Sequence, residues 1–301
     1  MNVPLPDPNP TADERVDVPG LVVVRGGGDL ATGVVQKLVR AGLPVVVLET
    51  AAPAAIRWRA ALCPAVWESR WAVEDLVGVR AESWESARDL LASGEPGVVP
   101  VLVDPEARLL TRVRPWAVVD AVIAKRNVGT HRGMAPVTVG CGPGFVAGED
   151  VDLVVETMRG HTLGAVLTRG AALPNTGVPG LIAGAAHERV IHAPAAGTIV
   201  VRRGIGAVVA EGEVLATIQG AEGETEVVST LAGVVRGMIP DGYRVGAGLK
   251  IADVDPRTEM ADACDTISDK SRAVGGAALE AVLWGLRRAG VWPGPAASAQ
   301  A

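Results

Sequence analysis

The sequence predicts an α/β fold, in which a Rossmann-like parallel-sheet domain precedes an all-β module and a C-terminal helix. Three observations lead to this prediction. Short Val-rich runs alternate with helical patterns from Leu21 to about Val155. The region from Val190 to Val254 is dense in Gly and Val and repeats itself at an offset of 36 residues. An apolar helical pattern then runs through Val274 and onward.

The boundaries follow from these patterns. Apolar runs of four to seven residues, such as LVVV, PVVVLE, VVPVLVD and PVTVG, suit strands that are buried on both faces of a parallel sheet. We therefore predict a Rossmann-like domain over residues 20–187, a β-rich module over 188–256 and a C-terminal helix over 257–290 that packs on the α/β domain. Residues 1–19 and 291–301 are expected to be disordered tails.

The first strand runs directly into the glycine-rich stretch RGGGDLATG. Gly26, Gly28 and Ala31 satisfy the G-x-G-x-x-G/A spacing, in which bare backbone allows a tight turn and close approach of a pyrophosphate. Gly27 lies inside this turn, and Glu49, at the end of the next strand, is placed to bind a ribose hydroxyl. The alternative is a Rossmann-like fold whose tight first turn binds no nucleotide.

Asp29 complicates the nucleotide interpretation. A carboxylate at the start of a helix competes with a phosphate for the same N–H groups. Asp29 could instead cap the helix, or position a sugar or a metal.

A second cluster, Lys125, Arg126 and Asn127, follows another predicted strand. Ligands of open parallel sheets bind beyond the carboxyl ends of the strands, so this trio is placed to bind phosphate or carboxylate. Lysine occurs only at positions 37, 125, 250 and 270, which makes Lys125 a candidate for a catalytic acid or base as well. The alternative is an ordinary solvated turn.

Two further segments carry candidate residues. The sequence GPG at Gly142 and Gly144 forces an open backbone whose N–H groups could bind an anion. His161 could act as a general base, although an exposed histidine without a role fits equally well.

The first turn of the predicted C-terminal helix contains a lysine, whose positive charge interacts unfavourably with the helix dipole. Thr266 and Asp269 have the spacing of a capping box, which places Lys270 in the first turn, where the helix dipole disfavours a cation. A bound anion nearby would make this placement tolerable, so Ser268, Asp269 and Lys270 are candidates for the edge of a site. Solvent exposure of Lys270 is the alternative.

The repeat aligns HAPAAGTIV with VSTLAGVVR and continues with a GxxVxxGxxL pattern in both copies. The pattern resembles the biotinyl/lipoyl type of barrel-sandwich, in which two copies pack with pseudo-two-fold symmetry. Carriers of that type have a modified Lys in the connection between the two halves. The connection here, QGAEGETE, contains no Lys, which argues against a carrier role and leaves docking or the covering of a neighbouring site.

Composition excludes several classes of protein. A net charge of −6, a pI near 5.4 and 3% aromatic residues argue against nucleic-acid binding. Three isolated Cys residues show no metal-binding spacing and favour a reduced, cytoplasmic protein without a structural metal. The N-terminal 20 residues lack the pattern of a signal peptide, and no stretch is apolar enough to span a membrane.

The motifs VVVRGGGDLATG, VDAVIAKRNVGT, GCGPGFVAGEDVDLVVET, NTGVPG and TISDKSRAVGG, in this order, resemble the YqeB-type family of the selenium-dependent molybdenum hydroxylase system. The resemblance implies an accessory protein that helps molybdenum-containing hydroxylases to mature, with hydroxylase subunits as its partners. It also implies a nucleotide or molybdopterin-type cofactor in the Rossmann-like domain. The chain is too small, and too poor in Cys, to be such a hydroxylase itself.

Three functions are therefore open. The first is a maturation factor that binds molybdopterin dinucleotide or a related nucleotide. The second is a small NAD(P)-dependent oxidoreductase with Lys125 or His161 as its acid or base. The third is a docking scaffold without catalysis. In each case the partner implied by the residues themselves is a small molecule or a protein, and not a nucleic acid or a membrane.

Overall fold

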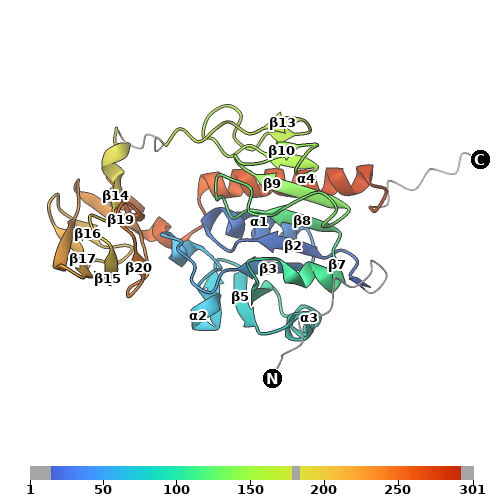
Figure 1. Ribbon diagram of the computed structural model, residues 1–301, viewed down its shortest axis with the longest axis horizontal. Helices are drawn as coiled ribbons and strands as arrows, with labels where there is room; N and C mark the ends of the chain where they lie inside the picture. Colours follow the sequence, from blue (N-terminus) through green and yellow to red (C-terminus); the bar gives the residue numbers. More distant parts are fainter. Residues whose placement is uncertain (1–14, 178–183, 293–301) are drawn as a thin grey trace, which may run out of the picture.

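The computed structural model describes residues 15–177 and 184–292, which form an α/β body and a smaller β-module at one end of it (Figure 1). The α-helices are α1 (Asp29–Arg40), α2 (Ala65–Glu68), α3 (Trp84–Ala92) and α4 (Asp269–Arg288). Short 3₁₀ helices are η1 (Trp58–Ala60), η2 (Arg108–Thr111), η3 (His187–Arg189) and η4 (Thr258–Asp265).

One nine-stranded sheet forms the centre of the body, in the order β12-β11-β9-β8-β2-β3-β6-β5-β4. Its strands are β2 (Val22–Arg25), β3 (Val45–Glu49), β4 (Arg70–Val73), β5 (Leu76–Ala81), β6 (Val98–Val103), β8 (Ala117–Asp120), β9 (Val137–Cys141), β11 (Leu153–Val155) and β12 (Val166–Leu167). The inner strands are parallel, whereas β4 and β12 pair antiparallel at the two edges. Two smaller pairs flank the sheet: β1 (Val16–Asp17) with β7 (Val113–Arg114), and β10 (Val146–Ala147) with β13 (Gly170–Ala171).

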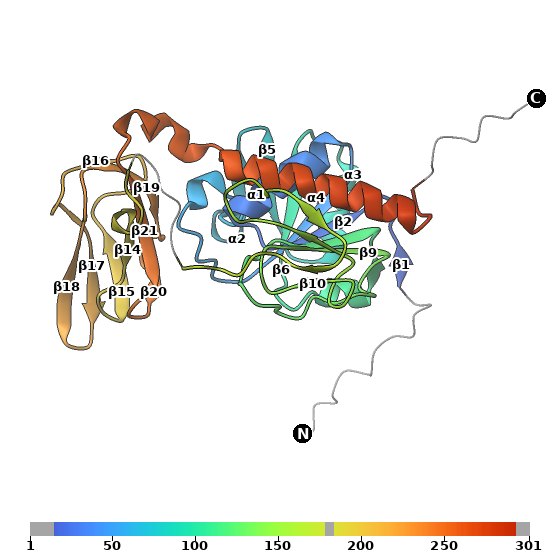
Figure 2. The ribbon, with the colours of Figure 1, turned by 90° about the horizontal axis from the view of Figure 1, so that it is seen from above.

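Both faces of the nine-stranded sheet are covered. On one face Val22 and Val24 pack with α1 and α4 in a single apolar core. On the other face Val23 and Val46 pack with Trp84 of α3 and with the η2 region. Figure 2 shows α4 running across the body above the sheet, beside α1. Burial on both faces explains why these strands are continuous runs of Val and not alternating patterns.

The helices α1 and α4 approach each other closely at two glycines. A Cβ atom on Gly33 would lie 2.2 Å from the carbonyl oxygen of Ser271, and one on Gly275 would lie 2.2 Å from the carbonyl oxygen of Gly33. Both distances are far below van der Waals contact, so this crossing requires glycine at both positions. The contact fixes the start of α4 against α1 and so positions the residues that begin both helices.

The β-module consists of two four-stranded sheets, β14-β21-β19-β16 and β18-β17-β15-β20. Its strands are β14 (Val190–His192), β15 (Gly197–Val201), β16 (Val208–Val209), β17 (Val214–Gly220), β18 (Gly223–Val228), β19 (Gly233–Met238), β20 (Arg244–Val245) and β21 (Lys250–Asp255). β15, β16 and β17 correspond to β19, β20 and β21 at the 36-residue offset of the sequence repeat. Apolar side chains from both sheets form one core, including Ile199, Leu215 and Ile251.

The predicted fold class, a Rossmann-like parallel-sheet domain joined to a biotinyl/lipoyl-like barrel-sandwich, is wrong. The described residues contain five sheets, and the largest is mixed, with nine strands. No α-helix crosses from β8 to β9 or from β9 to β11, although a doubly wound fold has such helices between its strands. The sequence missed this because Val-rich runs identify buried strands but not how the strands are connected.

Three further expectations concern the tails of the chain, the capping box and membrane-spanning segments. Most of the expected tails, 1–19 and 291–301, lies outside the described residues, although Val16–Asp17 forms β1. The predicted capping box at Thr266 and Asp269 is wrong, because Ser268 is the N-cap of α4 and its side chain accepts a hydrogen bond from the Ser271 N–H. Within residues 15–177 and 184–292, no helix is both long and apolar enough to cross a membrane.

Candidate functional site

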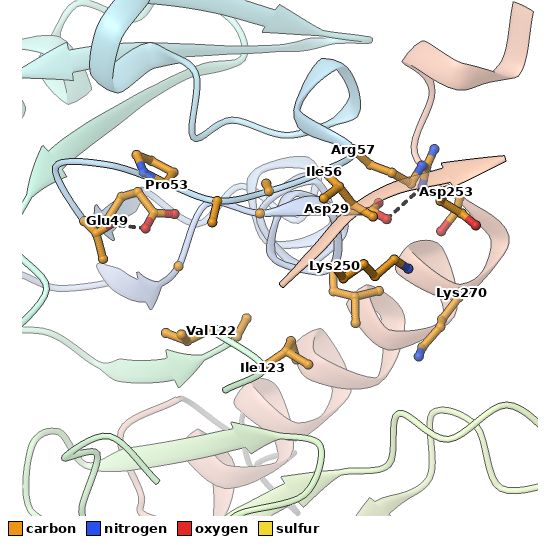
Figure 3. Close-up of a pocket in the computed structure, with 18 of the residues that line it drawn as sticks. Asp29, Glu49, Pro53, Ile56, Arg57, Val122, Ile123, Lys250, Asp253 and Lys270 are labelled. Atoms are coloured by element: carbon orange, nitrogen blue, oxygen red, sulfur yellow. Dashed lines mark hydrogen bonds and ion pairs between the residues drawn. The ribbon is translucent and has the colours of Figure 1, made fainter. Parts of the chain in front are cut away.

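A cavity of about 670 Å³ lies where the α/β body meets the β-module. Its walls come from the start of α1, the segment that follows β3, the loop that follows β8, the strands β19 and β21, and the start of α4. Figure 3 shows side chains from these elements around one open space. The body therefore supplies part of the site and the module the rest.

The segment after β3 joins the two units. The Ile56 carbonyl accepts a hydrogen bond of 2.7 Å from the backbone N–H of Met238 in β19. The Tyr243 hydroxyl donates to the carbonyl of Ala52, and Arg57 donates to the carbonyl of Thr266. The first two bonds hold the segment, and with it one wall of the cavity, against the module, and the third ties it to the chain just before α4.

Three cations of the cavity wall form no hydrogen bond or ion pair with any part of the chain that the structure describes: Arg236 from β19, Lys250 from β21 and Lys270 from α4. Arg236 and Lys270 are half-buried, while Lys250 is exposed at the cavity. Cations that are held partly away from water, as Arg236 and Lys270 are, usually have a partner. Two such cations without one, with Lys250 beside them, make the space suited to an anion.

The pKa values of these groups point the same way. Desolvation between the walls lowers the pKa of Lys270, and the Arg159 guanidinium lowers it further. Desolvation also lowers the pKa of Lys250. It lowers the pKa of Arg236 too, and the Arg57 guanidinium adds to this effect. A bound anion would oppose each of these shifts, because it favours the charged form of all three groups.

Two aspartates of the wall are already paired with arginines. Asp29 accepts a hydrogen bond of 2.8 Å from Arg57 and another of 2.8 Å from the Ser271 hydroxyl. Asp253 is paired with Arg189 at 2.9 Å. Asp29 therefore does not cap α1, whose N-cap is Gly28, and its charge is already balanced by Arg57.

The start of α1 and the start of α4 both lie at the cavity, since Gly28, Asp29 and Leu30 line it on one side and Ser268 and Lys270 on another. Helix N-termini carry a partial positive charge from their unpaired N–H groups. Here they add to the potential of the three cations and favour an anion in the same space.

In the glycine-rich turn, Glu49 accepts hydrogen bonds from the backbone. The Gly27 N–H donates to one oxygen of Glu49 at 2.7 Å, and the Thr50 N–H donates to the other oxygen, also at 2.7 Å. Glu49 thus takes an N–H that a pyrophosphate would need. Gly26, with φ of 91°, packs against the backbone of Val122. Gly26 thus serves close packing of backbone, while the predicted ribose contact of Glu49 stays a prediction, since Glu49 lines the cavity and each of its oxygens accepts only one hydrogen bond.

The Lys125, Arg126 and Asn127 cluster does not line the main cavity. Lys125 lines a neighbouring cavity of about 310 Å³, which shares Arg159 and Lys270 with the first one. Asn127 serves the loop, because its side-chain oxygen accepts hydrogen bonds from the N–H groups of residues 129 and 130. Arg126 is exposed.

The GPG turn is closely packed and not an open nest. The Gly142 N–H donates to the carbonyl of Val155 at 2.8 Å. A Cβ on Gly144 would lie 2.6 Å from the Cα of Arg126. His161 is exposed and lies outside the linings of the cavities described above. Gly142, Gly144 and His161 therefore do not line the main cavity.

The structure thus brings together six of the residues predicted from the sequence: Gly26, Gly28, Asp29, Glu49, Ser268 and Lys270. The sequence analysis missed Arg57 and Arg236, which lie in no motif. Lys250 carried a usable signal, because lysine is so rare in this chain. Of the four lysines, three line one of the two cavities and only Lys37 does not.

Comparison with solved structures finds only weak likenesses. A product-bound ectoine utilization protein EutE (DoeB) from Ruegeria pomeroyi is 10% identical, with 80% of this chain and 86% of that chain covered and a TM-score of 0.24. An aspartoacylase family protein from Mesorhizobium loti is 9% identical, with 80% and 86% covered and a TM-score of 0.25. A succinylglutamate desuccinylase/aspartoacylase from Rhodobacter sphaeroides is 25% identical over 23% of this chain and 22% of that chain, with a TM-score of 0.21. These TM-scores are too low to transfer an activity.

The predicted function is corrected by these findings. The solved structures reported above are named as an ectoine utilization protein, an aspartoacylase family protein and a succinylglutamate desuccinylase/aspartoacylase, and none of these names refers to molybdenum hydroxylases. In the turn that was expected to bind a nucleotide, the Gly27 N–H donates to Glu49. The maturation role, with its selenium and molybdenum cofactor features, is therefore wrong as stated, and the oxidoreductase and scaffold alternatives gain no support. The implied partnership with hydroxylase subunits rests on that role and stays a prediction.

No family model matches the chain. Among curated proteins, "Uncharacterized protein YqeB" from Escherichia coli (strain K12) is 47% identical over 263 residues, which is 87% of this chain. The chain spans about half the length of that relative, 47% of it. The chain is thus similar to this YqeB protein over most of its own length, and the similarity carries no role to it.

Proposed function

We propose that this protein binds a small anionic molecule, carrying phosphate or carboxylate groups, in the cavity between its α/β body and its β-module. The observation that carries the proposal is the convergence of Arg236, Lys250 and Lys270 on one space without partners among the residues described. Since each of the three comes from a different element, their convergence is a property of the assembled fold.

Neighbouring charges support the same proposal. Asp29, Asp253 and Asp269 are each paired with an arginine, so none of them neutralises the three cations directly. Charge-assisted hydrogen bonds from Lys and Arg to phosphate or carboxylate are about twice as strong as neutral ones. An anion in the cavity would therefore be held by three such donors.

The proposal is tested by titrating the purified protein with inorganic phosphate, pyrophosphate and citrate in a calorimeter. At least one probe is expected to bind, and Lys270→Ala, Lys250→Ala and Arg236→Ala should each weaken that binding by roughly tenfold, the loss of about 1.4 kcal/mol expected for one charged hydrogen bond. Lys37→Ala removes the same kind of side chain away from the cavity and should leave binding unchanged.

Two results would contradict the proposal. The first is the absence of binding for all three probes. The second is an equal loss of affinity in Lys37→Ala, because a nonspecific charge effect would then explain the binding.

A further inference from the structure

The cavity has two chemically different ends. Figure 3 shows Glu49 at one side and Lys250 and Lys270 at the other, with Val122 and Ile123 between them. A ligand that fills the space would meet an acceptor, an apolar wall and a cluster of cations in turn.

The middle of the cavity is apolar. Residues 52–56, with the sequence APAAI, form one wall, and Ala121, Val122 and Ile123 form another. Val122 is 43% exposed and lines the cavity. An apolar ligand body would remove this surface from water, and such burial is favourable.

The backbone of the apolar wall is strained. Ile123 has φ of 58°, in the left-handed region that β-branched residues almost never adopt. Strain of this kind persists only where the surrounding structure imposes it, and it gathers at ligand-binding sites. Here it places Ile123 in the linings of both the main cavity and the neighbouring one.

Glu49 leaves acceptor capacity at its end of the cavity. Each oxygen accepts one backbone hydrogen bond, from Gly27 or from Thr50. A carboxylate has about four acceptor positions, so roughly two are left. No described side chain forms an ion pair with Glu49, and the residue lines the cavity. A donor group on a ligand would complete this carboxylate.

The volume of the cavity agrees with a ligand larger than a bare phosphate. Its volume of about 670 Å³ lies within the range of pockets that enclose drug-sized molecules, roughly 300–1,000 Å³. A bare phosphate at the cations would leave the apolar wall and Glu49 without a contact.

We infer that the ligand is an elongated amphipathic anion. Its acidic group lies among Arg236, Lys250 and Lys270, its apolar body lies against Val122 and Ile123, and a hydrogen-bond donor such as an amine or hydroxyl lies at Glu49. This inference rests on the proposed function and adds the ligand's chemical class and its direction in the cavity.

The test uses three probes with the full chain: inorganic phosphate, benzylphosphonate and 4-aminobenzylphosphonate. Benzylphosphonate is expected to bind at least tenfold more tightly than phosphate, because it adds the apolar body. The amino group should tighten binding at least threefold further. Glu49→Gln should abolish the gain from the amino group and leave benzylphosphonate affinity within twofold, and Val122→Ser should weaken both aryl probes but not phosphate.

The outcomes separate the two proposals. Phosphate binding without any gain from the benzyl group overturns the ligand class and leaves anion binding intact. A gain from the amino group that persists in Glu49→Gln overturns the direction of the ligand. Failure of all three probes to bind overturns both proposals. The wild-type series needs no variant, so a folding defect in Glu49→Gln, detected by thermal unfolding, does not remove the test.

Discussion

Asp29 and Arg57 form an ion pair of 2.8 Å where α1, the segment after β3 and the start of α4 meet at the cavity. Arg57 is 7% exposed and also donates to the carbonyl of Thr266, just before α4. The second oxygen of Asp29 accepts a hydrogen bond from Ser271 in α4. One carboxylate thus ties the start of α1 to the segment after β3 and to α4.

Replacing Asp29 is therefore expected to destabilise the protein. Asp29→Asn leaves the buried Arg57 without its counter-charge. We expect the free energy of unfolding to fall by about 1–3 kcal/mol. This loss is smaller than for a fully buried pair, because Asp29 is partly exposed. Urea denaturation measures it. Asp89→Asn, which removes an exposed partner of Arg88, should change stability by no more than about 0.5 kcal/mol. Equal effects of the two variants would show that the Asp29 pair has no special role.

The crossing of α1 and α4 gives a matched pair of glycine variants. Gly275→Ala places a methyl group 2.2 Å from the carbonyl oxygen of Gly33, whereas a Cβ on Gly276 meets no atom within 4 Å. Gly275→Ala should lower the free energy of unfolding by about 2 kcal/mol or more through overpacking. Gly276→Ala should raise it by roughly 0.5–1 kcal/mol, because alanine favours the helix. Thermal unfolding of both variants checks this, and a similar change in both would contradict the close crossing.

The affinity for an anion should fall with rising pH, and it should begin to fall at a lower pH than it would if the lysines had their usual pKa. Lys250 and Lys270 have pKa values below the usual value of about 10.4. Below these lowered pKa values both lysines are charged and the affinity for an anion is at its highest. The affinity falls as the pH rises through the pKa values, because the lysines lose their charge. Phosphate affinity measured from pH 7 to 10 checks the direction. An affinity that stays constant over this range would contradict a role for the lysines.

The same shifts predict a rise in stability with pH in the absence of ligand. Between the lowered folded-state pKa and the unfolded value, the unfolded chain binds more protons, so the free energy of unfolding increases as the pH rises through that window. Lys270→Met removes the contribution of one group and should flatten the profile. Denaturant unfolding at several pH values below 10.4 measures it, with Lys37→Met as the control that keeps the wild-type slope.

The ion pair of Asp269 with Arg159 predicts how the stability of the protein changes at acid pH. The Arg159 guanidinium, through hydrogen bonds of 2.9 and 3.0 Å, lowers the pKa of Asp269 well below its usual range. Its stabilising contribution is present above the unfolded value of about 3.9 and is lost as the pH falls through the lowered folded-state pKa. Asp269→Asn should lose this pH dependence in unfolding measured from pH 5 to 2. The exposed Asp262→Asn variant is the control and should retain it.

Part of the site could be anticipated from local sequence. The glycine-rich turn, Asp29 and Lys270 stood out because each places an unusual residue at the start of a predicted helix, and all of them reach the cavity. The cost of a cation at a helix N-terminus is a local effect that sequence displays directly. Spacing along the chain placed Glu49 beside the turn but could not show that its carboxylate accepts a hydrogen bond from the Gly27 N–H. Its expected contact with a ribose hydroxyl stays a prediction.

The sequence by itself determined the buried Val-rich strands, the 36-residue repeat and the scarcity of lysine, because periodicity and composition are local properties of the chain. Only the tertiary structure decided how the nine strands are ordered and that β19, β21 and α4 face one another across the cavity. Arg236 and Lys270 are 34 positions apart and belong to no shared motif. Packing of the β-module against the body, through residues 52–59, brings them together, and no local pattern encodes that contact.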